Sequence, residues 1–447
     1  MAEDLATLGK QAADIVLSFP PLTKIRVVSH YDADGITAAA IICKALYRAG
    51  YDFHASLMRN PFDKGLERVK KEDNELIIFL DMGSGQIETI EQFDSKIIII
   101  DHHQHLKKDV ADHVLQINAN LCGINGNYEA SGSSLSFAVA MALNSKNADL
   151  SPLALAGVVG DKQYIGGMRG YNKTLLDEAL KNEYLTQKTS IKLSGDTLAD
   201  ALYYAVDPYY SGLSGDKKGI EKLIKNLNLE KTVKIEELND DQKMQLYSTL
   251  MFSLIKKGCQ QNILDTVIRE RYHSEMVHGE LERFADLLDA CGKGGNRGLG
   301  LAICLGDEDS YNEALSLEKE YKQTILDELL RLEKEGFEEK KSFRYFYSND
   351  SSLGGVIGGI ATNYLFDSKK PLLSLVRNDD ELHVSCRGNQ GLVSDGLDLG
   401  GAMKEAATEL KGHGGGHQIA AGATIDIKKE EEFLDMVDSI ISKQLKV

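Results

Sequence analysis

Short apolar runs near the start of the chain end, one after another, at an aspartate or a histidine. Three of them have the length and the apolar or β-branched character of a buried strand: residues 25–29, 76–80 and 97–100. Strands buried on both faces belong to parallel sheets covered by helices. Residues 153–159 are a weaker strand candidate, which a buried helix would explain as well. Because helical sequence such as residues 35–46 alternates with these runs, we expect a doubly wound α/β lobe.

Acidic residues and histidines follow each of these runs. In an open parallel sheet, ligands bind beyond the carboxyl ends of the strands, so four such ends would bring eight side chains together. They are His30, Asp32, Asp34, Asp81, Asp101, His102, His103 and Asp161. A single aspartate after a strand is usually a helix cap or a turn residue. The compact H-x-D-x-D and D-H-H clusters argue against that interpretation for the set as a whole.

So many carboxylates at one edge need a counter-charge, because like charges that lie close together repel. Carboxylate and imidazole ligands without a thiolate favour Mn²⁺ or Mg²⁺ over Zn²⁺ or Co²⁺. Two such ions about 3.5–4 Å apart are the usual apparatus for phosphoester hydrolysis. The sequence therefore predicts a pair of Mn²⁺ ions, with Mg²⁺ as the alternative. Asp101 has a second interpretation, in which it orients His102 instead of touching a metal.

The remaining sequence falls into a helical middle and a second α/β region. Residues 171–309 are dominated by helical patterns, and an amphipathic stripe over 310–337 predicts a long connector helix within 310–341. From residue 342 to the C-terminus strands return, which predicts a smaller lobe with a mixed sheet. Its expected strands are residues 342–347, 371–376 and 382–385, separated by helical stretches at 354–366 and 399–410.

A glycine-rich motif near the C-terminus, residues 412–422, is a candidate anion site. Gly414, Gly415 and Gly416 would let backbone N–H groups approach an anionic oxygen, with His413 and His417 beside them. A tight turn explains such a glycine cluster about equally well. The pairs at 354–355 and 358–359 lie in a helical pattern, where glycine permits close packing. Lys293 and Arg297 form a weaker candidate for binding nucleic acid.

Charge and composition exclude several classes of protein. Lys and Arg number 51 against 68 Asp and Glu, a net charge of −17 that argues against a protein that coats long duplex DNA. No apolar run approaches 18 residues, and the N-terminus is unlike a signal peptide. Six scattered cysteines without a CxxC pair fit a reducing cytoplasm, where we expect the protein to reside.

These motifs resemble those of a known superfamily. The clusters at residues 30–35, 81, 101–103 and 161 resemble the four motifs of the DHH phosphoesterase superfamily. Residues 412–422 resemble the glycine-rich signature of its DHH-associated C-terminal domain. The length of the chain and residues 287–301 are most similar to the archaeal RecJ-like subgroup. The resemblance implies a catalytic domain over 1–170 and a substrate-binding domain over 342–447.

The resemblance also implies a role for each residue. One Mn²⁺ would be held by His30, Asp32 and Asp81, and the second by Asp34, Asp81, His102 and Asp161, with Asp81 bridging. His103 would contact the scissile phosphate and assist the leaving oxygen. Arg387 matches a family position that grips phosphate, and a guanidinium fork suits that task.

The function that we predict is a Mn²⁺-dependent exonuclease that hydrolyses single-stranded DNA or RNA to mononucleotides, in archaeal replication or repair. A crevice between the lobes would admit one strand rather than a duplex. One alternative is a small-nucleotide phosphodiesterase, oligoribonuclease or nucleotide phosphatase of the same superfamily. A replisome scaffold that binds the GINS complex with little catalysis is an alternative of another class, because a eukaryotic helicase cofactor is related to this family.

Overall fold

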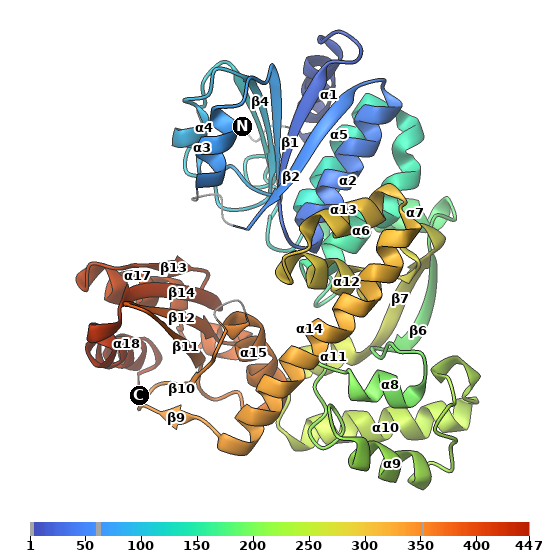
Figure 1. Ribbon diagram of the computed structural model, residues 1–447, viewed down its shortest axis with the longest axis vertical. Helices are drawn as coiled ribbons and strands as arrows, with labels where there is room; N and C mark the ends of the chain where they lie inside the picture. The colour runs from blue at the N-terminus through green and yellow to red at the C-terminus, as the bar shows by residue number, and fades with distance from the viewer. Residues whose placement is uncertain (1–3, 60–63, 351–352, 447) are drawn as a thin grey trace. The chain divides into compact units, whose positions relative to one another are not determined.

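The computed structural model describes residues 4–59, 64–350 and 353–446 of the chain. These residues form two compact units, and neither unit is continuous in sequence (Figure 1). Unit 1 comprises Met1–Ser190 and Glu270–Glu318, and unit 2 comprises Ile191–Arg269 and Lys319–Val447. The chain therefore leaves unit 1, builds part of unit 2, and returns to unit 1 before it ends in unit 2.

A five-stranded parallel sheet forms the centre of unit 1, with the strand order β2-β1-β3-β4-β5. The strands are β1 (Lys24–His30), β2 (Asp52–Met58), β3 (Leu76–Leu80), β4 (Lys96–Asp101) and β5 (Val114–Asn118). The three inner strands correspond to the three apolar runs of the sequence. The predicted doubly wound α/β fold is thus confirmed.

Helices cover both faces of this sheet because its strands are apolar on both sides (Figure 1). Val27 faces one buried cluster and Val28 faces the other. The first face packs against α1 (Leu5–Leu17), α2 (Ala33–Arg48), α5 (Gly132–Leu143) and α6 (Ser151–Gly160), and the second against α3 (Lys64–Lys70) and α4 (Ile87–Ile90). Helix α7 (Gly170–Lys181) packs against α6.

Residues 153–159 are not a strand, which corrects the weaker of the strand predictions. They lie in α6, which is apolar and buried on all sides, so its sequence shows no helical periodicity. A short apolar run cannot be assigned to strand or helix by periodicity alone. The decisive local signal is Pro152 in the first turn of α6, a position that favours proline.

The second segment of unit 1 returns to the edge of the sheet where the acidic motifs lie. It holds α12 (Leu281–Lys293) and α13 (Arg297–Leu305), which pack against α2. The boundaries between the units fall within two strands and a long helix, namely β6 (Thr186–Ile191), β7 (Ile268–Ser274) and α14 (Glu308–Glu335). The short strand β8 (Gly279–Glu280) completes a small sheet in the order β6-β7-β8. Helix α14 is the predicted connector helix.

Unit 2 combines helices with a mixed six-stranded sheet in the order β13-β14-β12-β11-β10-β9. The strands are β9 (Glu338–Glu339), β10 (Arg344–Tyr347), β11 (Leu372–Asn378), β12 (Glu381–Arg387), β13 (His413–Gly416) and β14 (Ala420–Asp426). Only β10 and β11 pair in parallel; the other neighbours are antiparallel. The predicted mixed sheet of the C-terminal lobe is therefore confirmed.

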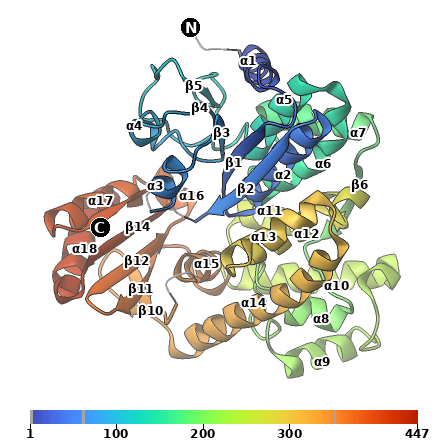
Figure 2. The ribbon, with the colours of Figure 1, turned by 45° about the horizontal axis from the view of Figure 1, so that its top comes forward.

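The helices of unit 2 fall into two sets that are separate in sequence (Figure 2). The middle region contributes α8 (Leu198–Tyr203), α9 (Lys217–Asn226), α10 (Asp240–Lys256) and α11 (Gln261–Val267). The C-terminal region contributes α15 (Gly354–Ile360), α16 (Gln390–Ser394), α17 (Leu399–Glu409) and α18 (Glu430–Leu445). A π-helical turn, Ala361–Leu365, continues α15.

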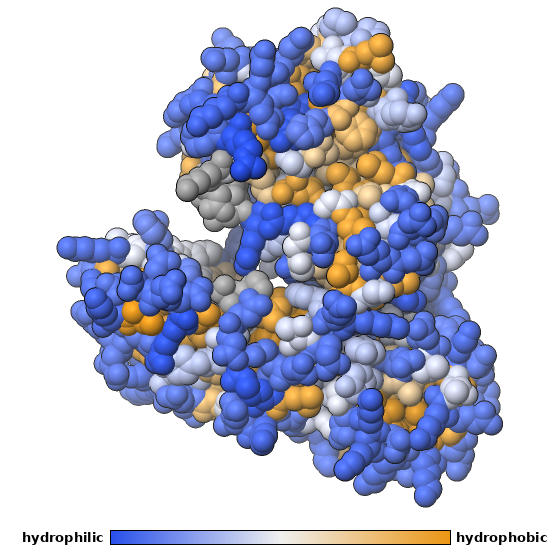
Figure 3. Space-filling view, in the orientation of Figure 1, coloured by the Kyte–Doolittle hydropathy of each residue, from blue (hydrophilic) through white to orange (hydrophobic). Residues whose placement is uncertain are grey.

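The surface is mostly hydrophilic on the face shown in Figure 3, in keeping with the 27% of charged residues. Among the described residues, no helix has both the length and the apolar character needed to cross a bilayer.

Candidate metal centre

The loop after β1 brings three predicted ligands to the start of α2. His30 ends β1, Asp32 caps the N-terminus of α2 by accepting a hydrogen bond from Gly35 N (3.1 Å), and Asp34 lies in the first helical turn. A Cβ atom on Gly35 would lie 2.4 Å from the carbonyl oxygen of His30. Only glycine therefore fits at this position of the H-x-D-x-D-G motif.

Asp81 follows β3 and lies at the middle of the cluster. Its side chain is 2% exposed, and its backbone has the left-handed φ of +55°, which is uncommon for a residue other than glycine. Its carboxylate lies 3.1 Å from His102 Nε2 and 3.4 Å from His30 Nδ1. An uncommon backbone conformation retained at such a position is typical of a functional site.

Asp101 ends β4 and holds the two histidines that follow it. Its carboxylate accepts hydrogen bonds from Ser84 N (2.9 Å), His103 N (3.1 Å) and His103 Nδ1 (2.8 Å). His102 is buried, whereas the side chain of His103 is 44% exposed. Asp101 therefore orients His103 and not His102, which corrects the second interpretation of Asp101. His102 is oriented by Gly126 O, which lies 2.6 Å from its Nδ1 atom.

The N-terminus of α5 holds the carboxylate of Asp34. That carboxylate accepts hydrogen bonds from Ser131 Oγ (2.8 Å), Gly132 N (2.7 Å) and Ser133 N (3.0 Å). A helix N-terminus stabilises an anion through its free N–H groups and its dipole. We did not predict this contact from the sequence, although Ser131-Gly-Ser-Ser before an apolar stretch is a recognisable helix-cap signal.

Asp161 follows the C-terminus of α6 and not the end of a strand. It lies 3.8 Å from His102 Nε2 and accepts a hydrogen bond from Gln163 Nε2 at 2.8 Å. The prediction that Asp161 joins the other acidic residues does not depend on the type of element that carries it. Nothing in the sequence alone indicates that Gln163 contacts this cluster.

The structure brings the predicted ligands together in three overlapping groups. In each group, one atom of every member lies within 4.8 Å of the others: His30–Asp32–Asp81, Asp34–His102–Asp161 and Asp81–His102–His103. Two buried atoms, His30 Nδ1 and Asp81 Oδ1, have no hydrogen-bond partner among the described residues. This holds although the Asp81 carboxylate lies beside both His30 and His102. A nitrogen and an oxygen donor that are buried in this cluster without a hydrogen bond fit ligands of a divalent cation.

Burial and mutual repulsion shift the pKa values of this cluster strongly. Burial, with Asp81 and Asp161 nearby, raises the pKa of Asp34 to about 7. Burial also raises the pKa of Asp161, to about 6. For the histidines, burial lowers the pKa but the neighbouring carboxylates outweigh it, so that the pKa of His30 rises to about 11 and that of His103 to about 9. A bound cation would replace the proton of Asp34, Asp161 or His30.

Arg387, the predicted phosphate grip, lies at the end of β12 in unit 2. A Cβ atom on Gly355 of α15 would lie 2.5 Å from its Nη2 atom, so the glycine lets the guanidinium lie against this helix. The guanidinium donates to the carbonyl of Cys386 (2.9 Å), and no carboxylate pairs with it in the part of the chain that the structure describes. A partly buried, unpaired guanidinium is suited to an anionic ligand.

The glycine-rich motif forms the edge strand β13, the turn in which His417 N donates to Ala420 O (2.8 Å), and the start of β14. Its three central glycines therefore lie in a strand, and the tight turn follows them. Cβ atoms on Gly414 and Gly416 would lie 2.3 Å from Met403 O and 2.6 Å from Ala421 Cα, so these glycines allow packing against α17 and β14. A Cβ on Gly415 would meet nothing within 4 Å. His413 and His417 are exposed at the two ends of the strand.

An arginine-lined pocket of about 380 Å³ lies beside the acidic cluster within unit 1. Its lining includes Arg26, Arg59, Arg68 and Arg297, together with Met58, which pairs in register with His30. Arg26 is paired with Glu72, whereas no acidic residue among those described pairs with the other three arginines. The sequence suggested Arg297 only weakly. Its companion Lys293 forms an ion pair with Asp289.

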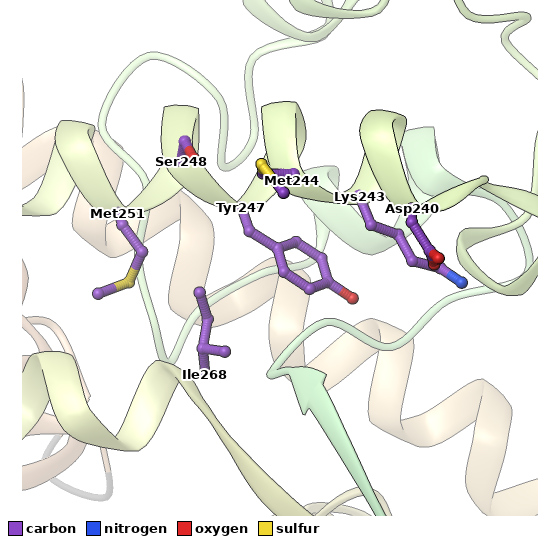
Figure 4. Close-up of a pocket in the computed structure, with 7 residues that line it drawn as sticks. All are labelled: Asp240, Lys243, Met244, Tyr247, Ser248, Met251 and Ile268. Carbon is purple, nitrogen blue, oxygen red and sulfur yellow. The ribbon is translucent and has the colours of Figure 1, made fainter.

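A separate groove in unit 2 contains none of the predicted residues. It holds about 460 Å³ and is mostly apolar. One face of α10 and the start of β7 line it, as Figure 4 shows: Asp240, Lys243, Met244, Tyr247, Ser248, Met251 and Ile268. It lacks the converging acids and histidines that phosphoester chemistry needs.

Comparison with known proteins identifies the family. The model of the DHH family N-terminal domain matches residues 24–159, and that of the DHHA1 domain matches residues 343–443. The chain belongs to the DHH family. An uncharacterized protein of Methanocaldococcus jannaschii is 31% identical to this chain over 94% of each chain. The predicted domain boundaries at 170, 309 and 341 stay predictions.

Solved structures share the fold of this DHH protein. RecJ from Thermus thermophilus in complex with Mn²⁺ has a TM-score of 0.62 at 17% identity, covering 98% of this chain and 55% of RecJ. This chain thus spans about half the length of that protein. CDC45 from Entamoeba histolytica has a TM-score of 0.64 at 13% identity, covering 98% of this chain and 97% of CDC45. The fold is RecJ-like.

Proposed function

We propose that this DHH protein is a Mn²⁺-dependent exonuclease that hydrolyses single-stranded DNA or RNA to mononucleotides. The observation that carries the proposal is the convergence of acids and histidines on the buried Asp81. Phosphoester hydrolysis with two cations requires such an arrangement, in which one carboxylate serves both ions. The likeness in fold to RecJ, described as an exonuclease bound to manganese, supports the choice of substrate and metal.

Two sets of ligands follow from the groups in the cluster. His30, Asp32 and Asp81 would hold one cation, and Asp34, His102 and Asp161 would hold the other with Asp81 between them. Bound cations would activate the attacking water and neutralise the charge that develops on the phosphoryl oxygens. The protein itself fixes the geometry, since α5 holds Asp34 and Gly126 orients His102.

His103 is suited to contact the substrate directly. Asp101 accepts a hydrogen bond from its Nδ1 atom and so leaves Nε2 on the exposed side of the ring. A donor at Nε2 can stabilise the scissile phosphate or give a proton to the leaving oxygen. The half-exposed position distinguishes His103 from His102, which is buried among the proposed ligands.

Each unit, taken by itself, offers candidate contacts for phosphate. In unit 1, Arg59, Arg68 and Arg297 line a pocket beside the end of β1 and carry three charges without acidic partners among the described residues. In unit 2, Arg387 and the accessible backbone at Gly415 would bind a terminal phosphate or nucleotide. A few phosphate contacts of this kind suit one strand better than a duplex.

The test is a time course with Mn²⁺ on single-stranded DNA and RNA labelled separately at each end. We expect mononucleotides from one labelled end, and no product when EDTA removes the cation. Asp81→Asn is expected to abolish hydrolysis with the fold intact. Asp177→Asn is the matched control, because Asp177 is exposed on α7 and, among the described residues, pairs only with Lys173. Normal turnover by Asp81→Asn would overturn the proposal.

The same assay separates a small-nucleotide enzyme from an exonuclease. Comparable rates on a dinucleotide and on a 20-mer favour the exonuclease, whereas hydrolysis of the dinucleotide alone identifies a small-nucleotide phosphodiesterase. A chain that releases only inorganic phosphate from mononucleotides is a nucleotide phosphatase. All three use the same cluster, and the products distinguish them.

The likeness in fold to CDC45 supports a second role as a scaffold in a replisome. In that role the protein would bind GINS, and the tagged protein would copurify with it from archaeal extract. Copurification with full hydrolytic activity would combine both roles. Copurification by a protein without hydrolytic activity would favour the scaffold alone.

A further inference from the structure

Gln163 is a buried carboxamide that contacts the acidic cluster from behind. It lies two residues beyond Asp161 and is 1% exposed. Its Nε2 atom lies within hydrogen-bond distance of Asp161 Oδ2 (2.8 Å), Gly126 O (2.9 Å) and Ala130 O (3.1 Å). Its Oε1 atom accepts a hydrogen bond from Nδ2 of the buried Asn172 at 2.7 Å. Asn172 thus fixes which end of the amide faces the cluster.

One acceptor of this network also orients a histidine. Gly126 O lies 2.6 Å from Nδ1 of His102 as well as 2.9 Å from Nε2 of Gln163. A hydrogen bond at Nδ1 places the proton there and leaves Nε2 to bind a metal. Gln163 therefore holds Asp161 directly and His102 through one carbonyl.

Both residues belong to the same group of potential ligands. Asp161 and His102 lie with Asp34 in one group, whereas the other proposed cation site consists of His30, Asp32 and Asp81. Within the described part of the chain, Gln163 makes its hydrogen bonds to Gly126, Ala130, Asp161 and Asn172, and so to no proposed ligand of that other site. The network acts on one of the two sites.

We propose that Gln163 is a positioning residue that sets the affinity of the Asp34–His102–Asp161 cation site and leaves the His30–Asp32–Asp81 site unchanged. The inference rests on the proposed two-cation function. Residues that hold metal ligands in place typically change metal affinity 10–100-fold when they are replaced. Removing the amide would therefore weaken one cation and not the other.

The experiment measures Mn²⁺ binding by calorimetry and by electron paramagnetic resonance, without substrate. We expect the wild-type protein to bind two ions whose spins couple. Gln163→Leu keeps a similar volume and loses the donor, so we expect one ion at the wild-type affinity and the second weakened 10–100-fold, with loss of the coupled signal. Asn172→Leu, which frees the amide to rotate, is expected to weaken the same ion to a smaller extent.

A buried amide remote from the cluster provides the control. Asn147 is also fully buried in unit 1, where it donates to Ala140 O and accepts from Arg48. Asn147→Leu should therefore lower the melting temperature yet bind both ions as the wild type does.

Two results would overturn the inference. Wild-type affinity for both ions in Gln163→Leu would mean that the amide does not position the ligands. Equal weakening of both ions would mean that Gln163 supports the fold in general. If the wild-type protein itself binds fewer than two ions, the proposed function fails first and the inference with it. The wild-type titration thus separates the two failures.

Discussion

Gly35 shows how little space the motif after β1 allows. A Cβ atom would lie 2.4 Å from the backbone oxygen of His30, and backbone cannot move aside as a flexible side chain can. The glycine lets the chain turn from strand to helix tightly enough to bring His30, Asp32 and Asp34 to the same edge of the sheet. Glycine is therefore required at position 35 for a geometric reason, because the backbone of His30 lies so close to it.

We predict that Gly35→Ala destabilises the protein by about 1–3 kcal/mol, the usual cost of overpacking, and abolishes paired Mn²⁺ binding. Thermal unfolding and calorimetric titration measure the two effects. Gly298→Ala in α13 is the control, because a Cβ there would meet nothing within 4 Å, and we expect unchanged or slightly raised stability. A Gly35→Ala protein with wild-type melting temperature would contradict the prediction.

The shifted pKa values predict that Mn²⁺ binding is linked to protons. With a pKa of about 7, Asp34 is mostly protonated at pH 6, and His30 carries a proton up to about pH 11. Each group must lose its proton to bind a metal, so affinity for Mn²⁺ should rise from pH 6 to pH 8. Calorimetry in two buffers with different ionisation enthalpies measures the released protons. Zero release at pH 7 would contradict this.

The same shifts set the stability of the metal-free protein. Because the pKa of Asp34 is raised from 3.8 to about 7, the folded state binds more protons than the unfolded state in that window. Its contribution is present at low pH and is lost as the pH rises. The raised pKa of His30 likewise makes the stability of the folded state fall as the pH rises above 6.5. Mn²⁺ should therefore raise the melting temperature more at pH 8 than at pH 6. An equal rise at the two pH values would contradict this prediction.

At the scale of elements, α5 links the fold to the site. Ser131 caps the helix and also donates to Asp34, so a residue that begins the helix is a residue that holds a proposed ligand. We predict that Ser131→Ala lowers the free energy of unfolding by about 1 kcal/mol and weakens Mn²⁺ binding.

A matched cap distinguishes the two effects of that substitution. Thr197 caps α8 in unit 2 by accepting from Asp200 N, away in sequence from every proposed ligand. Thr197→Ala should lose a similar amount of stability and bind Mn²⁺ unchanged. Denaturant unfolding and Mn²⁺ titration of both variants provide the comparison. Unchanged Mn²⁺ affinity in Ser131→Ala would show that the bond to Asp34 has no role in binding.

The elements also show what a single sequence can and cannot predict. The inner strands of the first sheet were predictable because both their faces are buried, which leaves a continuous apolar run. The sequence analysis predicted neither edge strand, β2 nor β5. Strand β2 is largely half-exposed, so its sequence mixes polar and apolar residues. Asp161 was placed in the right cluster on the wrong type of element. Contacts such as that of Gln163 depend on tertiary geometry and leave no local pattern.

For the whole molecule, the charge of −17 restricts how nucleic acid can bind. Three arginines in unit 1 line one pocket without acidic partners among the described residues, so the expected number of phosphate contacts there is small. A strongly acidic protein with a few basic positions binds through these positions and is repelled elsewhere.

We predict a shallow salt dependence for binding of single-stranded DNA by the inactive Asp81→Asn protein. At about 0.7 per phosphate contact, Arg387 and the three arginines of the unit 1 pocket give a slope of about −3 in log affinity against log salt. Arg297→Gln should reduce that slope by about 0.7, whereas Lys231→Gln, which replaces an exposed partner of Glu221, should not change it. Fluorescence anisotropy across a salt series measures the slope, and one much steeper than −4 would contradict a small contact set.

The order in which the chain is synthesised matters for a unit built from two separate segments. Asp289 of α12 accepts a hydrogen bond from Ala33 N, and Gly292 packs against the carbonyl of Tyr31, so the loop that carries Asp32 is completed by residues about 250 positions later. A nascent chain that has released only its first 190 residues holds every proposed ligand but lacks the helix that packs on that loop. Full assembly of the proposed metal site thus waits until the first segment of unit 2, Ile191–Arg269, and α12 have been synthesised. Gene fragments that stop before α12 should yield an incompletely packed site.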